Sequence, residues 1–234
     1  MAQICGQNDQ VDAFRGGVDV YASFASMVFG RPVTKKEQPN HRFIGKAGVL
    51  GLGYGCGAER FHWMVVTQAR QHGISLREMF DEGIAEITVK TYRTLYDRIP
   101  AMWRQLDRLL RLVIKNDYAQ EMELGPVTIA PRRIELPNRL ALRYDEVPEG
   151  GTLLENICQA LARVIIMEAA LRLEQRGYRF VLQVHDELVF CVPNDQVDEA
   201  RTAIMHEMTR PPAWLPDLPL AAEIKAGDDY GSCQ

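Results

Sequence analysis

The spacing of apolar residues predicts a helical first half of the chain. Apolar positions recur there every three or four residues with polar positions between them, which is the period of helices with one buried face. A polar stretch with two prolines at residues 31–41 predicts a loop between helices. The expected helices are short ones within residues 9–30, followed by residues 39–52, 58–71 and 83–115.

Individual residues add detail to these helices. Asp9 and Asp19 each precede an apolar run and are predicted to cap a helix. Pro100 is expected to interrupt the long helical region. The apolar stripe after this proline most simply packs into a core, and it consists of Met102, Leu106, Leu109, Leu110 and Val113.

The pattern changes near Gly125. Residues 126–144 combine prolines with alternating apolar positions, which is typical of short strands and turns. A helix is predicted over residues 153–175, and two β-rich runs around a charged tip follow it. The last elements expected are an amphipathic helix capped by Asn194 and a strand candidate at residues 218–224.

Composition indicates an ordinary globular protein. The 234 residues are 47% hydrophobic and 25% charged, which is enough for one large domain or two small ones. No apolar run approaches the length of about 18 residues that a membrane helix needs, and the N-terminus lacks a secretory pattern, so a cytoplasmic location is expected. The five cysteines form no CxxC pair, which favours reduced thiols over disulfides or a zinc site.

The net charge of −4 conceals an uneven distribution. Residues 31–115 carry 15 Lys and Arg against 8 Asp and Glu, whereas residues 116–234 carry 11 against 20. A basic middle suits an anionic partner, and an acidic end suits metal binding or simple solubility. Charge alone leaves these interpretations and a chance distribution of solvated charges open.

A charged tip between the two β-rich runs is the first candidate site. His185, Asp186 and Glu187 separate branched and aromatic residues that predict buried strands. Two neighbouring carboxylates at a rigid hairpin tip can hold Mg²⁺, which prefers oxygen ligands. The simpler interpretation is a polar turn, but the tip lacks the Gly or Asn that tight turns favour.

A basic helix face is the second candidate site. Its two cations lie one turn apart and repel each other unless an anion lies between them, and a polyphosphate suits a forked Arg beside a Lys. A flat base or sugar suits the apolar and aromatic residues further along, whereas a solvated basic face is the simpler alternative. The stripe is spaced by four and consists of Arg42, Lys46, Leu50 and Tyr54.

Together these motifs resemble those of family A DNA polymerases, the DNA polymerase I group. The resemblance rests on Arg42-x3-Lys46-x7-Tyr54-Gly55 followed by Val184-His185-Asp186-Glu187, and it covers essentially the whole chain. The segments LGLGYGCG and ENICQA are most similar to bacteriophage members. The resemblance implies an α+β fold with residues 1–10 as a palm remnant, 11–118 as helical fingers, and 119–234 as a palm built on an antiparallel sheet.

The resemblance also implies roles for the basic face and for one helix. Arg42 and Lys46 would grip the triphosphate of an incoming dNTP, and Tyr54 would stack near the nascent base pair. Leu50 stands where the family usually has an aromatic residue against the nucleotide sugar, so sugar discrimination is expected to differ. Primer-template DNA would contact one polar helix face, formed by Asn156, Gln159 and Arg163.

At the charged tip, the resemblance implies a two-metal site for DNA synthesis. Asp186 would bind catalytic Mg²⁺ with Glu187 beside it, and His185 would support the primer terminus. The other metal-binding Asp of the family belongs to a motif like Asp-Tyr-Ser-Gln-Ile-Glu, which is expected just before Cys5-Gly6-Gln7 and has no substitute in the sequence. The family's thumb and any exonuclease domain are also absent from it.

These departures predict a C-terminal polymerase fragment. It would extend a primer only with an N-terminal partner chain that supplies the first catalytic Asp and the thumb. A split palm should also expose an apolar strand edge and promote self-association. The alternatives are a non-catalytic DNA- or nucleotide-binding module with the same fold and, with less support, a small metal hydrolase using the charged tip.

Overall fold

The computed structural model describes residues 1–76, 79–117, 119–145 and 148–233. The chain divides into two compact units. The first unit comprises Met1–Glu135 and Ala141–Ile157, and the second comprises Leu136–Leu140 and Cys158–Gln234. The combination of many helices with small antiparallel sheets confirms the α+β class.

The first unit is mainly helical, as the apolar period predicts. Its core includes the stripe after Pro100, whose five members are all buried. No helix of the described residues is long and apolar enough to cross a membrane. The helices are α1 (Ala2–Cys5), α2 (Asn8–Arg15), α3 (Val20–Phe29), α4 (Pro39–Gly51), α5 (Ala58–Gln71), α6 (Glu82–Leu95) and α7 (Arg98–Leu109), with a 3-10 turn η1 (Leu52–Tyr54) and a π-helical turn η2 (Leu110–Ile114).

Two details of the helix boundaries differ from expectation. Asp19 caps α3 by accepting a hydrogen bond from Ala22 N, as predicted, but Asp9 lies inside the first turn of α2, where its carboxylate accepts from the Gln7 side chain. Pro100 also lies inside the first turn of α7 rather than between helices. A proline is tolerated there because its missing N–H would have no intrahelical partner.

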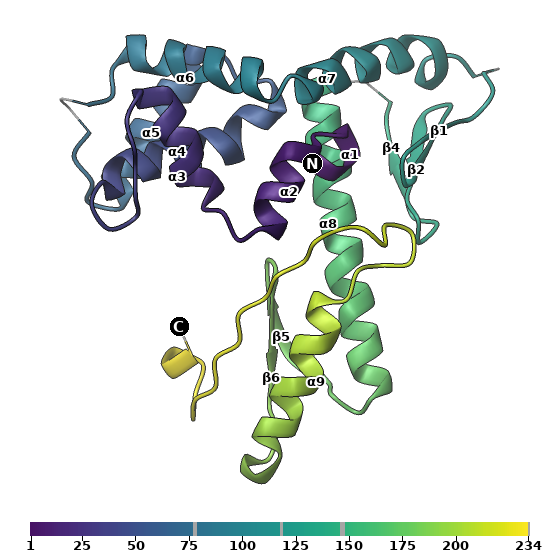
Figure 1. The fold of residues 1–234 in the computed structure, drawn as a ribbon. Helices are drawn as coiled ribbons and strands as arrows, with labels where there is room; N and C mark the ends of the chain where they lie inside the picture. Colours follow the sequence, from purple (N-terminus) through teal and green to yellow (C-terminus); the bar gives the residue numbers. More distant parts are fainter. Residues whose placement is uncertain (77–78, 118, 146–147, 234) are drawn as a thin grey trace. The chain divides into compact units, whose positions relative to one another are not determined.

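Helices α3 and α4 pack against each other in the first unit (purple in Figure 1). Gly45 permits this approach, because a Cβ atom at this position would lie 2.3 Å from the carbonyl oxygen of Tyr21 and 2.8 Å from Cβ of Ala25. A glycine inside a helix costs about 1 kcal/mol relative to alanine. The packing of the two helices at Gly45 therefore compensates for the cost of placing a glycine inside α4.

Replacing Gly45 by Ala is expected to destabilise the first unit by about 1–3 kcal/mol, because backbone must move to admit the methyl group. Chemical denaturation measures the loss. Gly83→Ala in α6 is the matched control, since its Cβ would meet only the Asp81 side chain at 3.4 Å. The control should be neutral or slightly stabilising, and equal losses in both variants would contradict close packing as the cause.

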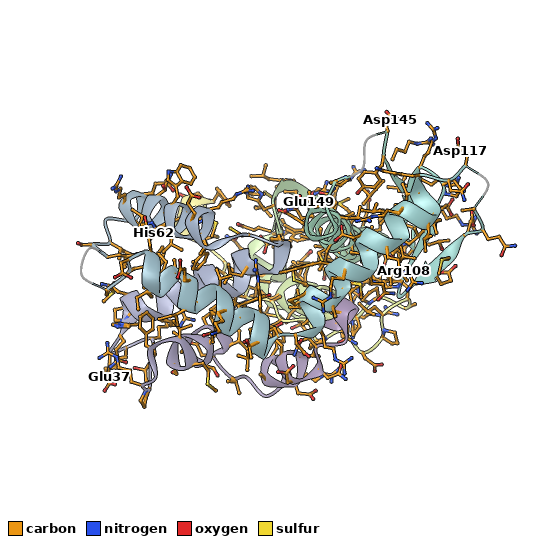
Figure 2. The ribbon with its side chains drawn as sticks, turned by 90° about the horizontal axis from the view of Figure 1, so that it is seen from above. Glu37, His62, Arg108, Asp117, Asp145 and Glu149 are labelled. Atoms are coloured by element: carbon orange, nitrogen blue, oxygen red, sulfur yellow. The ribbon has the colours of Figure 1, made fainter. Side chains whose placement is uncertain are left out.

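A four-stranded antiparallel sheet completes the first unit (Figure 1); its last three strands confirm the prediction for residues 126–144, whereas its first strand precedes Gly125 and was not predicted. Its inner face is apolar, with buried Ile129 opposite buried Ile134. At its exposed end Arg132 forms an ion pair with Asp117, and Asp145 lies nearby (Figure 2). The strands follow in chain order as β1 (Met122–Leu124), β2 (Val127–Ala130), β3 (Arg133–Glu135) and β4 (Ala141–Arg143).

The second unit contains most of helix α8, which runs from Gly150 to Gln175, and a two-stranded hairpin. Helix α9 begins at Val197 after a 3-10 turn, so Asn194 starts that turn and is not the helix cap. Residues 218–224 form no strand, and Pro219 within them lacks the N–H that a ladder requires. The other elements are β5 (Phe180–Val184), β6 (Glu187–Phe190), η3 (Asn194–Gln196), α9 (Val197–Thr209) and η4 (Gly231–Cys233).

The hairpin β5–β6 is less buried than its sequence predicts. Val181 is 60% exposed and Leu182 is 44% exposed, and no residue of either strand is buried. Within the described residues the two strands pair only with each other, so a third strand does not cover them. The burial expected of these strands is therefore wrong, and self-association through an apolar strand edge stays a prediction.

A buried carboxylate joins α8 to α9 in the second unit. The Glu207 side chain is only 5% exposed and accepts hydrogen bonds from Arg172 Nε at 2.8 Å and Arg176 Nη1 at 3.0 Å. Burial by itself raises the pKa of Glu207, but hydrogen bonds from Arg172, Arg176 and His206 outweigh it and lower the pKa to about 2. This cluster fixes the helix pair that lies beside the hairpin (Figure 1).

Candidate functional site

The basic face predicted in the first unit lies on α4 and the turn after it. Arg42, Lys46 and Leu50 follow one another at four-residue spacing on α4, and Lys46 and Leu50 are exposed. The α-helix ends at Gly51, so Tyr54 lies on the 3-10 turn η1 and not on the helical stripe. The expected face therefore has three helical members and a fourth that the fold positions separately.

Neighbouring helices of the first unit hold η1 in place. Trp103 Nε1 donates a 2.8 Å hydrogen bond to the carbonyl of Gly53. A Cβ atom on Gly151 would lie 2.6 Å from the carbonyl oxygen of Tyr54, so the start of α8 packs directly on this turn. Gly55 then ends the turn with φ 85°, a conformation that glycine adopts without strain. The backbone at Tyr54 is thus fixed from two sides.

Arg42 has two partners on α3 that the sequence pattern did not reveal. Its Nε donates to Asp19 Oδ2 at 2.6 Å, and its guanidinium carbon lies 5.3 Å from the ring centroid of Tyr21. Burial raises the pKa of Asp19, but the hydrogen bonds from Arg42 and Ala22 outweigh it and hold the pKa below its usual value. Only the role of Asp19 as a helix cap could be found from sequence.

The polar residues predicted on α8 fall in both units. Asn156 belongs to the first unit and donates a 3.2 Å hydrogen bond to the hydroxyl of Tyr144. Gln159 and Arg163 belong to the second unit and are exposed. Their spacing of three and four places all three on one face of the helix.

The charged tip of the second unit is the turn of the β5–β6 hairpin. Val184 pairs with Glu187, so His185 and Asp186 form a two-residue loop. His185 has φ 52°, the left-handed conformation that favours Gly or Asn in such turns. His185, Asp186 and Glu187 are all exposed. A histidine kept at a strained turn position is consistent with a functional tip, because strain of this kind gathers at functional sites.

A cavity of about 1290 Å³ borders this tip within the second unit. Its lining includes Asp186 and Glu187 together with apolar residues of α8 and α9, such as Ile165 and Ile204. The segment before the C-terminus contributes Glu223 and Lys225. The carboxylates therefore face a space that a substrate or another chain segment can enter.

The donor set at the tip suits a hard cation such as Mg²⁺. Asp186 and Glu187 offer carboxylate oxygens, which are the preferred ligands of that ion. Among the described residues, no group of three or more His, Cys, Asp or Glu side chains is arranged to hold a metal ion. The tip thus fits part of a coordination shell, with other oxygen ligands to be supplied by water, phosphate or further protein groups.

The two candidate sites offer complementary chemistry in separate units. The α4 face presents a guanidinium and an ammonium group, which bind phosphate oxygens, whereas the hairpin tip presents two carboxylates. Phosphoryl transfer with metal assistance uses both kinds of group.

Comparison with known proteins finds sequence similarity to DNA polymerases along almost the whole chain. Residues 155–232 match the sequence model of DNA polymerase family A, a span that includes α8 from Glu155 onward and the hairpin tip. The DNA polymerase of Bacillus phage SP02 is 28% identical over 98% of this chain and 39% of its own length. The thermostable DNA polymerase I of Thermus filiformis is 26% identical over 98% of this chain and 25% of its own length.

A solved structure shows the same fold. The POL domain of Pol1 from M. smegmatis, in complex with DNA primer-template and dNTP, matches 99% of this chain with a TM-score of 0.65 and 21% identity. This chain covers 38% of that one, and it spans about two fifths or less of the curated relatives named above. Residues 155–232 thus match DNA polymerase family A, and the whole chain is similar in sequence to DNA polymerases and in fold to the polymerase domain of Pol1.

Proposed function

We propose that this chain forms the fingers and palm of a template-directed DNA polymerase, which transfers a nucleotide from a dNTP to a primer 3′-hydroxyl. Residues 11–118 act as fingers, and residues 1–10 and 119–234 act as palm. The observation that carries the proposal is the combination of a basic α4 face with a carboxylate hairpin tip in a chain whose residues 155–232 match DNA polymerase family A. Neither group of side chains alone would distinguish a polymerase from a solvated surface.

The α4 face binds the incoming nucleotide in this proposal. Arg42 presents a forked donor and Lys46 an exposed point charge, so together they hold a triphosphate and neutralise the departing pyrophosphate. Leu50 packs against the sugar, and Tyr54 stacks near the nascent base pair from its fixed turn. Lys46 therefore contributes to dNTP use more than to stability.

The hairpin tip provides the catalytic residues of the palm. Asp186 and Glu187 would hold the metal ion from the exposed turn, and His185 would support the primer terminus. When bound, Mg²⁺ supplies charge stabilisation to the attacking and leaving oxygens. Asn156, Gln159 and Arg163 contact the primer-template duplex from α8, and such contacts to phosphate weaken as salt rises. Template pairing, rather than these side chains, selects the nucleotide.

A second chain completes the metal site. We infer that this partner carries the first catalytic Asp and the thumb, because the tip contributes two adjacent carboxylates and a two-metal site needs more oxygen ligands.

Primer extension with Mg²⁺ and dNTPs tests the proposal. The chain alone is expected to extend no primer, whereas the chain mixed with an N-terminal polymerase piece carrying the first Asp extends it. Lys46→Ala in the mixture should raise the dNTP concentration needed for half-maximal rate by roughly tenfold, since one charged phosphate contact is lost. Extension by the chain alone would refute the need for a partner.

A non-catalytic DNA- or nucleotide-binding module is the second candidate, favoured by the lack of a complete metal cluster among the residues that the structure describes. It predicts salt-sensitive binding of primer-template DNA with no extension in either sample. A mixture that binds DNA and extends no primer would therefore favour the module over the polymerase.

A further inference from the structure

The guanidinium of Arg42 is held on one edge and one face by residues of α3. Asp19 accepts from Nε at 2.6 Å, and the Tyr21 ring lies under the guanidinium at 5.3 Å from the carbon. The terminal nitrogens Nη1 and Nη2 have no hydrogen-bond partner among the described residues. One edge of the group is thus occupied, and the forked edge is left for a ligand.

Close packing of α3 on α4 creates this arrangement. Asp19 precedes α3, and the first turn of that helix carries Tyr21, whose carbonyl lies against Gly45 of α4. Residues 23 positions apart in sequence are brought into contact in this way. Asp19 is itself fixed, because its other oxygen caps α3 by accepting from Ala22 N at 3.0 Å. The carboxylate is therefore a rigid support for the guanidinium.

We propose that Asp19 is a positioning residue for phosphate binding: it fixes the Arg42 guanidinium, through Nε and against the Tyr21 ring, so that Nη1 and Nη2 face the triphosphate as a preformed fork. This inference rests on the proposed function of the α4 face. Arginine carries roughly 2 kcal/mol of rotamer entropy, and a side chain that is already ordered loses less of it on binding. Because Asp19 and Tyr21 belong to α3 and its cap, nucleotide affinity then depends on α3 as well as on α4.

A counter-ion role for Asp19 predicts the opposite effect. If Asp19 only neutralised Arg42, removing its charge would free the guanidinium and tighten the binding of an anion. Positioning predicts weaker binding, because the guanidinium would lose its fixed orientation. The sign of the change in affinity therefore separates the two roles.

Asp19→Asn is the appropriate variant because it separates the two contacts of Asp19. An Asn side chain still caps α3 with its oxygen, but its NH₂ group cannot accept from Arg42 Nε. The melting temperature should therefore stay near that of the unmodified chain. Calorimetric titration of the full chain with dATP should show affinity reduced by about tenfold, because binding must then order a guanidinium that Asp19 no longer holds.

A double-mutant cycle distinguishes positioning from a structural role. In an Arg42→Ala chain, Asp19→Asn should cause no further loss of dATP affinity, because there is no guanidinium to position. A purely structural effect of Asp19 would persist in that background and would overturn the inference. Asp12→Asn removes an exposed carboxylate that pairs with Arg15 instead of Arg42, and this control should bind dATP as the unmodified chain does.

The titration also separates this inference from the proposed function. If the unmodified chain does not bind dATP, the triphosphate site on α4 is wrong and the inference falls with it. If the unmodified chain binds dATP and Asp19→Asn binds equally well or more tightly, the site stands and the positioning role is refuted. Weaker binding that depends on Arg42 supports both.

Discussion

Replacing Asp186 by Ala is expected to abolish primer extension by the proposed mixture of the chain with an N-terminal polymerase piece, with a rate loss of about 10³-fold or more. The variant removes a carboxylate from the point where metal ions would stabilise the reacting oxygens, and such stabilisation is among the largest contributions to catalysis. Asp186 lies in an exposed two-residue loop, so the fold of the hairpin should not depend on it. DNA binding should remain within about twofold.

The control for this variant is another exposed acidic residue of the same unit. Asp195 lies on η3, is exposed, and does not line the cavity beside the tip. Asp195→Ala changes the net charge by the same amount and should leave extension intact. Primer extension rates and gel-shift assays of DNA binding are measured for both variants. Unchanged extension in Asp186→Ala would show that Asp186 is not a metal ligand.

Replacing Glu207 by Gln is expected to destabilise the second unit by about 3 kcal/mol at neutral pH. The carboxylate is buried and paired with Arg172 and Arg176, so the amide would leave both arginines without a charged acceptor at this buried position. The lowered pKa of Glu207 corresponds to a free energy of the same order, because a tenfold change in an acid dissociation constant is worth about 1.4 kcal/mol. Hydrogen exchange of α9 peptides under denaturant measures the loss locally.

The pH dependence of this effect has a defined sign. A folded-state pKa of about 2 against an ordinary value of 4.5 means that the unfolded chain binds the proton more readily. The stabilisation is complete above about pH 4.5 and is lost as the pH falls from there towards 2. The difference between the unmodified chain and Glu207→Gln should therefore shrink over that range, since Gln does not titrate.

An exposed ion pair at the C-terminal end of α8 serves as the control for Glu207. Glu174 pairs with Arg179 at 3.3 Å, but the two side chains are 46% and 82% exposed. Glu174→Gln should cost less than about 1 kcal/mol, because solvent screens such pairs. Losses of similar size in both variants would show that burial of Glu207 does not set its contribution.

Local sequence signals were sufficient for most of the helices. Asp19 marks the start of α3, and Gly30 ends it in a left-handed conformation, both of which follow from neighbours within four residues. The predicted helix at residues 58–71 matches α5 residue for residue. Capping and apolar period depend on short-range contacts, and for this reason they can be read along the chain.

Where several caps or partners compete, the sequence was a poorer guide. Asn194 was a plausible cap, but the chain forms a 3-10 turn first and α9 begins at Val197. The runs around His185 predicted buried strands, yet β5 and β6 pair only with each other among the described residues and stay exposed. Burial of a strand depends on which other segments cover it, and a strand's own residues do not specify that.

The sequence by itself determined the α+β class, the positions of the helices, and the motifs on α4 and at the hairpin tip. Only the tertiary structure decided that the Arg42 guanidinium contacts Asp19 and Tyr21, and that the buried carboxylate of Glu207 pairs with two arginines. These partners are 21 to 35 residues apart in the chain. Such contacts depend on the distance between two packed helices, which Gly45 sets for α3 and α4. The residue pattern of a single helix does not determine that distance.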